Sequence, residues 1–194
     1  MQKQKGDSME KGKRGIDTKS MTQIALCVTL LSVASYLVIP LPFTPIVLSM
    51  HTVMVNLIGL LLKPKHAACT IGLYLLMGLI GLPIFSGGTS GPAKLFGPTG
   101  GFYFGFLFAV VLISLFKGEK INLIRYIVVT IFLGIPVQHM FAIAFMCFHN
   151  GFNLKAAALT VSIPFIPGDI IKCVIASVIG VSLNKVFAKL SIDV

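Results

Sequence analysis

Long apolar runs alternate with short polar gaps along most of the chain. The runs cover residues 24–39, 46–62, 67–81, 99–116, 124–148 and 156–187. A helix needs roughly 20 apolar residues to cross a bilayer, and the first five runs approach this length. The last run has 32 residues and is interrupted by Pro164 and Pro167-Gly168, so we expect a short helical piece near 154–163 and a final helix near 168–187. The pattern predicts an all-α integral membrane protein with six transmembrane helices in one bundle.

Composition favours the same class. Hydrophobic residues make up 56% of the 194 residues, charged residues make up 11%, and the mean hydropathy is +0.94. A soluble domain carries about 25% charged residues, so this chain lacks the polar side chains to cover a globule. Disorder is excluded because disordered segments have low hydrophobicity. Six helices also leave no room for a separate soluble catalytic or nucleotide-binding domain.

The basic residues predict an orientation in the membrane. Thirteen of the sixteen Lys and Arg lie in the N-terminal tail, in the gaps after the second and fourth helices, or near the C-terminus. Cytoplasmic segments carry such an excess. We therefore predict a basic cytoplasmic tail at 1–22, a membrane domain at 23–187 and a short cytoplasmic C-terminus at 188–194. The net charge of +10 then reflects topology, and nucleic acid is not an expected partner.

A Gly-rich stretch at 81–105 follows the third predicted helix. It holds eight of the nineteen glycines and three of the ten prolines. Such backbone is tolerated at membrane depth only where protein or a water-filled cavity covers it. The fourth helix then opens at Gly100-Gly101, where free backbone N–H groups attract an anion such as a carboxylate. The alternative is a structural cap with small-residue packing at Gly101-xxx-Gly105.

Two charged residues stand alone near the start of the final helix. Asp169 is the only acidic residue away from the tail, the 117–125 loop and the C-terminus, and Lys172 is the only basic residue inside a span. Their spacing of three places them on one helix face. Charges inside a membrane are costly and usually mark a functional site. The alternative is an ion pair that satisfies itself and locks the helix end.

The predicted topology brings both stretches to the outer mouth of the bundle. The fourth and the final helix both begin on that side, so the Gly-rich loop, Asp169 and Lys172 converge there. Together they predict a site for a small polar or anionic molecule that arrives from outside. His51 and Asn56 on the second helix either face the bundle interior or contact this ligand. The four cysteines and four histidines show no metal or disulfide spacing, and we expect no metal and no cofactor.

The sequence resembles the BioY family, the biotin-binding S components of energy-coupling-factor (ECF) transporters. The resemblance covers nearly all of residues 22–187. It rests on GLPIFSGG (81–88), GPTGGF (97–102), LLLKPKHA (60–67) and PFIPGDIIK (164–172), which is similar to the family's PFLPGDLLK. His51 stands where the family usually has a glutamine. An Ala-xxx-Ala motif, which S components use to dock on their coupling subunit, is not evident around Ala25, Thr29 and Ala34.

The resemblance implies a bacterial cytoplasmic-membrane subunit that captures biotin for uptake and has no catalytic activity. Partner proteins would be a transmembrane coupling subunit and two ATPase subunits. Asp169 and Lys172 are similar to residues that hold the ureido ring. The biotin carboxylate would lie toward Lys94 or toward the amides near Gly100, Gly101 and Tyr103. The remaining expected ligand contacts are the closing loop and the second helix: Gly87, Gly88, Thr89, Ser90 and His51.

Two other functions stay open at this point. One is a self-sufficient transporter for another small anionic solute, and the other is a small membrane enzyme. An enzyme needs a poised acid, base or metal, and only Asp169 and Lys172 offer one. Secondary transporters typically contain internal repeats, and the sequence shows none.

Overall fold

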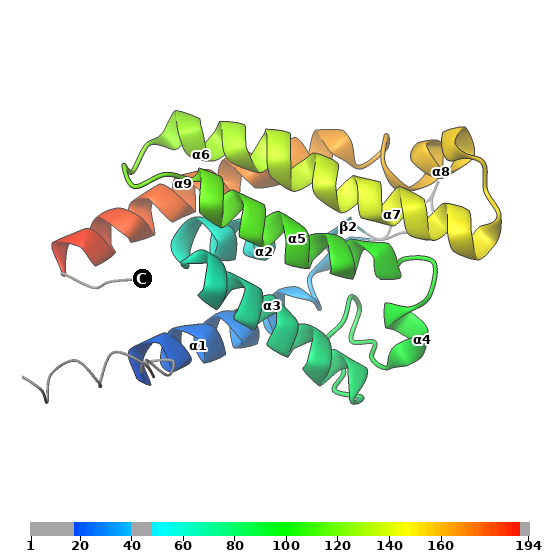
Figure 1. Ribbon diagram of the computed structural model, residues 1–194, viewed down its shortest axis with the longest axis horizontal. Coiled ribbons are helices and arrows are strands. Elements are labelled where there is room, and N and C mark those ends of the chain that lie inside the picture. The colour runs from blue at the N-terminus through cyan, green and yellow to red at the C-terminus, as the bar shows by residue number, and fades with distance from the viewer. Residues whose placement is uncertain (1–17, 40–47, 191–194) are drawn as a thin grey trace, which may run out of the picture.

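The computed structural model describes residues 18–39 and 48–190, which are mostly helical (Figure 1). Two two-residue strands, β1 (Val38–Ile39) and β2 (Leu48–Ser49), form a small antiparallel ladder. The helices in chain order are α1 (Thr18–Ala34), α2 (His51–Leu61), α3 (Pro64–Leu79), α4 (Pro92–Leu95), α5 (Gly100–Phe116), α6 (Leu123–Val129), the π-helical η2 (Thr130–Gly134), α7 (Ile135–Asn150), α8 (Leu154–Val161) and α9 (Ile166–Lys189). Apart from the ladder, the predicted all-α fold is confirmed.

The helices form one bundle around α2 and α5. Figure 1 shows α5 between α3 and the rod made by α6, η2 and α7. The pairs α5–α7, α2–α9, α3–α5 and α1–α3 are in contact. All but one of the residues of α2 are buried. Helices α4 and α8 lie at one end of the bundle, and the C-terminal end of α9 lies at the other.

The helix boundaries differ from the sequence prediction at the first two runs. Helix α1 begins at Thr18, inside the predicted tail, and ends at Ala34 rather than at residue 39. Val38 and Ile39 instead pair with Ser49 and Leu48. The ladder therefore takes residues from the end of the first apolar run and the start of the second. Most of the predicted tail and the last four residues lie outside the described residues.

The fifth apolar run forms one rod with a π-helical turn inside it. Pro136 has no N–H, and its ring would collide with a carbonyl of the preceding turn in a regular helix. Directly before it, the N–H of Ile135 donates to the carbonyl of Thr130, five residues back. The wider π turn accommodates the proline without ending the rod. The prediction of a continuous helix over 124–148 is therefore confirmed in its extent but not in its regularity.

The surface of the bundle is strongly apolar. Two helical segments among the described residues, Leu123–His149 and Ile166–Lys189, are long and apolar enough to cross a membrane, whereas α1, α2 and α5 are shorter apolar helices. Large hydrophobic side chains remain exposed on several helices, including Leu26, Leu76, Phe132, Met140 and Ile171. Exposed apolar surface on this scale fits contact with lipid.

Lys117 caps the short central helix at the end opposite α4 and α8. Its Nζ donates to the carbonyl of Leu60 at 2.9 Å and to that of Leu62 at 2.8 Å. These carbonyls end α2 and have no partner within the helix. Burial, together with nearby Lys63, lowers the pKa of Lys117 to about 8. The amine therefore links the end of α2 to the end of α5.

Lys117→Ala is expected to destabilise the fold by about 1–3 kcal/mol, because it removes two charge-assisted hydrogen bonds to partly buried carbonyls. Thermal unfolding of the purified protein in detergent measures the effect. Lys120→Ala is the matched control, since Lys120 is exposed in the same loop and surface changes usually stay within about 0.5 kcal/mol. Equal unfolding temperatures for the two variants would show that the Lys117 contacts add nothing.

Candidate functional site

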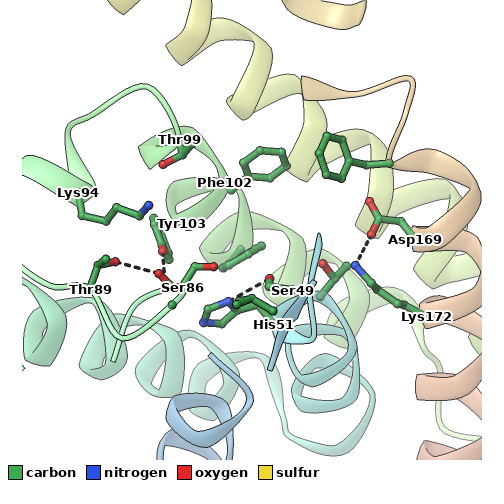
Figure 2. A pocket seen from close by; sticks show the side chains of 15 residues that line it. Ser49, His51, Ser86, Thr89, Lys94, Thr99, Phe102, Tyr103, Asp169 and Lys172 are labelled. Carbon is green, nitrogen blue, oxygen red and sulfur yellow. Dashed lines mark hydrogen bonds and ion pairs between the residues drawn. The ribbon is translucent and has the colours of Figure 1, made fainter. Parts of the chain in front are cut away.

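A cavity of about 230 Å³ lies at the end of the bundle that carries α4 (Figure 2). Its walls come from the strand ladder, the start of α2, the Gly-rich loop, α4, the first turns of α5 and the start of α9. The lining residues are Val38, Ser49, His51, Thr52, Ser86, Gly87, Thr89, Lys94, Thr99, Phe102, Tyr103, Phe106, Phe165, Asp169 and Lys172. The two stretches singled out in the sequence thus meet at one cavity.

The start of α9 supplies the charged wall. Lys172 Nζ lies 3.0 Å from Asp169 Oδ1, and the two side chains are only 8% exposed. Pro167 occupies the first turn of α9 and Asp169 follows it there, where the helix dipole favours a negative charge. The predicted alternative of an internal ion pair is present in the structure. Both residues nevertheless line the cavity, so the pair is also open to the space inside it.

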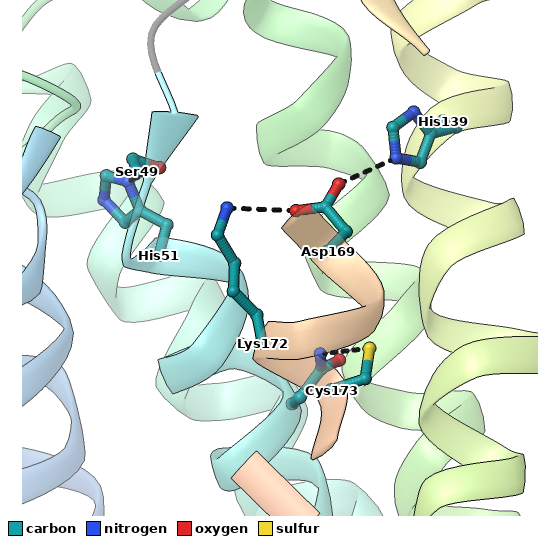
Figure 3. A network of polar contacts seen from close by, with 7 residues as sticks. Ser49, His51, His139, Asp169, Lys172 and Cys173 are labelled. Carbon is teal, nitrogen blue, oxygen red and sulfur yellow. Dashed lines mark hydrogen bonds and ion pairs between the residues drawn. The ribbon is translucent and has the colours of Figure 1, made fainter. Parts of the chain in front are cut away.

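A third polar side chain, that of His139, contacts Asp169 without lining the cavity. His139 Nε2 on α7 lies 3.0 Å from Asp169 Oδ2, as Figure 3 shows. His139 was not among the predicted site residues. Its partner is thirty residues away on another helix, so no local spacing links the two. The one signal in the sequence is a polar residue in the middle of an apolar run.

The opposite wall holds a chain of hydrogen bonds that reaches the Gly-rich loop. His51 Nε2 lies 2.7 Å from the Tyr74 hydroxyl, which donates to the carbonyl of Ile84 at 2.7 Å. The Tyr74 oxygen therefore accepts from Nε2–H, which leaves Nδ1 as an acceptor. Ser49 Oγ lies 3.2 Å from Nδ1 and is then the donor. His51 is buried in the bundle interior, as one sequence alternative predicted, and it also lines the cavity.

Hydrogen bonds hold the Gly-rich loop in place along this side of the cavity. The N–H of Ser86 donates to the Tyr103 hydroxyl at 3.0 Å, and the N–H of Gly87 donates to the carbonyl of Ser35 at 2.9 Å. Gly87 and Gly88 have φ values of 72° and 73°, which residues with a Cβ rarely adopt. Phe85 is fully buried, with its ring centroid 4.6 Å from that of Tyr103. These glycines let the loop turn back on itself while Phe85 anchors it.

Lys94 is the second cation at the cavity. Figure 2 shows it reaching toward the cavity from α4, across from Asp169 and Lys172. Partial burial lowers the pKa of Lys94, so its charged form is short of stabilising partners. Among the described residues it makes no ion pair within 4.0 Å. An anionic group of a ligand would supply the missing countercharge.

Seven of the eleven predicted site residues line the cavity, and four do not. The seven are His51, Gly87, Thr89, Lys94, Tyr103, Asp169 and Lys172. The four others are Gly88, Ser90, Gly100 and Gly101. The expectation of a free amide at Gly100 is corrected, because that N–H donates to the carbonyl of Gly97 at 2.8 Å. Gly101 packs against the backbone of Phe141 on α7, as the small-residue alternative predicted.

Sequence reasoning missed most of the apolar and hydroxyl-bearing wall. Phe102 and Phe106 project from the first turns of α5, and Phe165 precedes α9. Ser86, Thr99 and Phe165 lie inside the stretches already singled out, so proximity could have indicated them. Phe106 had no such signal, because one phenylalanine among fifteen is indistinguishable from a core or lipid-facing residue.

The cavity can bind an elongated molecule with two different polar ends. At one end, Asp169 accepts and Lys172 donates hydrogen bonds. At the other end, Lys94 attracts an anion. Aromatic side chains, including Phe102 and Phe106, lie along the wall and suit an apolar middle portion.

Known proteins resemble this chain along most of its length. Residues 4–189 match the BioY family. The chain is 36% identical over 170 residues to "Biotin transporter BioY2" of Lactococcus lactis subsp. cremoris, covering 86% of this chain and 90% of that protein. It is 34% identical over 166 residues to "Probable biotin transporter BioY" of Pyrococcus horikoshii, covering 86% and 96%.

A solved structure shares the fold. It is the crystal structure at 2.1 Å of "the S-component for biotin from an ECF-type ABC transporter", with a TM-score of 0.79 and 28% identity. The match covers 86% of this chain and 91% of that one. The predicted resemblance is therefore confirmed, and the chain belongs to the BioY family.

Proposed function

We propose that this chain is a biotin-binding membrane subunit that captures biotin for uptake as the S component of an ECF-type ABC transporter. One observation carries the proposal: the cavity places the Asp169–Lys172 pair opposite Lys94, in a chain whose relatives are named biotin transporters. Those names also favour a transport subunit over an enzyme. Biotin is then the transported ligand, and no cofactor is required.

The two ends of biotin match the two ends of the cavity. The ureido N–H groups need an acceptor, which the Asp169 carboxylate supplies, and the ureido oxygen needs a donor, which Lys172 supplies. The valerate chain would extend along Phe102 and Tyr103, and its carboxylate would pair with Lys94. Gly87 and Thr89 would close the loop side over the ligand. The non-lining Gly88, Ser90, Gly100 and Gly101 would act by shaping the backbone.

The proposed membrane arrangement follows the helices and the charges. Six spans would be formed by α1, α2, α3, α5, the α6–α7 rod and α9, with the Gly-rich loop between α3 and α5 at the outer surface. Residues 23–187 would form the membrane domain of a bacterial cytoplasmic-membrane protein. Both termini would be cytoplasmic, because the gaps after α2 and α5 carry the basic residues. A coupling subunit and two ATPase subunits would provide the energy.

Equilibrium binding tests the proposed function directly. Purified protein in detergent is titrated with biotin, and desthiobiotin and lipoate serve as competing ligands. Desthiobiotin keeps the ureido ring and the carboxylate, whereas lipoate keeps only the carboxylate and an apolar chain. We expect saturable binding of one biotin per chain, with competition by desthiobiotin and none by lipoate at the same concentration. Absence of saturable biotin binding would overturn the proposal.

Lys94→Ala is expected to weaken biotin binding about fivefold or more, since a half-buried ion pair exceeds the roughly 1 kcal/mol of an exposed one. The neutral biotin amide should lose much less, because it has no charge for Lys94 to neutralise. Titrating both ligands against both proteins measures the difference. Lys155→Ala, an exposed lysine at the start of α8, is the control. Equal losses for the acid and the amide would remove Lys94 from the carboxylate site.

A further inference from the structure

His139 is a buried polar residue that contacts the proposed ligand site without lining it. It is 5% exposed and lies on α7, where its ring forms a T-shaped pair with that of Phe102 at a centroid separation of 5.8 Å and an interplanar angle of 80°. The only hydrogen bond of its side chain in the described part of the chain is that of Nε2 to Asp169 Oδ2, and the buried Nδ1 has no partner. The polar contacts of this ring are thus directed entirely at the Asp169 carboxylate.

The carboxylate of Asp169 is held from two different helices. Lys172 lies three residues further along α9 and moves together with Asp169, whereas His139 belongs to α7 (Figure 3). Among the described residues, His139 is the only side chain from another helix within hydrogen-bonding distance of this carboxylate. The contact therefore fixes both the rotation of the carboxylate and the position of the start of α9 relative to α7.

The contacts with Lys172 and His139 leave part of the Asp169 carboxylate free to accept hydrogen bonds from a ligand. An ionised carboxylate offers about two lone pairs on each oxygen. Lys172 occupies one site on Oδ1, and His139 occupies one site on Oδ2. One acceptor position then remains on each oxygen. A neutral ligand group with N–H donors, such as the ureido ring, matches these positions.

We infer that His139 is a positioning residue that orients the Asp169 carboxylate toward the N–H donors of the ligand. This inference rests on the proposed function. Without His139, the carboxylate is free to rotate toward Lys172 and place both of its oxygens on the amine, which withdraws acceptors from the cavity. His139 acts through Asp169 and does not itself touch the ligand.

Substitution of His139 separates this role from simple packing. His139→Leu removes the donor and should weaken biotin binding about tenfold or more. His139→Gln keeps an N–H near the position of Nε2 and should bind biotin within about threefold of the parent. His149→Leu is the matched control, because His149 is an exposed histidine near the end of the same helix. Biotin titration of all four proteins in detergent gives the comparison.

A double-mutant cycle with Asp169→Asn supplies a measurement that a packing role would not change. If His139 acts through the carboxylate, His139→Leu costs little further affinity once Asp169 is asparagine. Equal losses in the two backgrounds, a Gln variant as weak as the Leu variant, or a Leu variant that binds like the parent would each overturn the inference. Where His139→Leu cannot be purified, His139→Asn replaces it, because its shorter amide does not reach Oδ2.

The two possible failures are distinguishable. If the proposed function is wrong, the parent protein itself does not bind biotin. If only the positioning role is wrong, the parent binds biotin and the His139 variants follow one of the contradicting patterns. Thermal unfolding of each variant, recorded without biotin, shows whether a lost affinity reflects a lost fold.

Discussion

Asp169→Asn is expected to weaken biotin binding about 10- to 150-fold, the largest loss of affinity among the lining residues. A charge-assisted hydrogen bond in a buried site is worth about 1.5–3 kcal/mol. Asparagine keeps the shape of the side chain but replaces one acceptor oxygen with an NH₂ donor, which opposes the N–H groups of the ligand. Lys172→Met should act similarly, because it removes the donor to the ureido oxygen. Biotin titration in detergent measures both losses.

A double variant separates the affinity of this pair from its contribution to stability. Asp169 and Lys172 are 6% and 7% exposed, and removing one partner of a buried pair typically costs 3–5 kcal/mol because the other charge is left unpaired. The variant carrying both Asp169→Asn and Lys172→Met leaves no unpaired charge. It should recover most of the unfolding temperature and none of the affinity. If the single variants bind biotin as well as the parent, the pair is purely structural.

The sequence predicted those parts of the fold that hydropathy alone determines. The expected helix over 99–116 is observed as Gly100–Phe116, and the final helix near 168–187 is observed as Ile166–Lys189. Apolar periodicity cannot indicate the β1–β2 ladder, because three of its four residues, Val38, Ile39 and Leu48, are as apolar as the neighbouring helices. The four-residue helix α4 was also missed. It lies in a Gly- and Pro-rich segment where composition predicts only a loop.

The site was predictable where a residue differed in chemistry from its surroundings. Asp169 and Lys172 were found because they are isolated charges in an apolar segment. His139 was missed because its importance comes from the crossing of α7 and α9, which leaves no trace in local spacing. Gly101, by contrast, was predicted to contact the ligand but does not line the cavity. A glycine at a helix start suits both an anion and close helix packing, and only the tertiary contact with α7 decides between them.

That contact predicts a large structural effect for Gly101→Val. A Cβ at Gly101 would overlap the Phe141 carbonyl oxygen and lie 2.8 Å from Phe145 Cβ. Because the carbonyl is helix backbone, α5 and α7 must move apart to accept the side chain. Overpacking of a close-packed contact costs about 1–3 kcal/mol and occasionally more. We expect a loss at or above the upper end of this range, measured as thermal unfolding in detergent.

Gly72→Val is the matched control for this substitution. Gly72 also lies in a helix, but a Cβ there would meet nothing within 4 Å. Biotin binding should distinguish the two variants further. Phe102, next to Gly101, lines the cavity, so a displaced start of α5 carries this wall away from the ligand and weakens binding beyond the loss of stability. If Gly101→Val unfolds and binds biotin like Gly72→Val, then the glycine does not set the distance between α5 and α7.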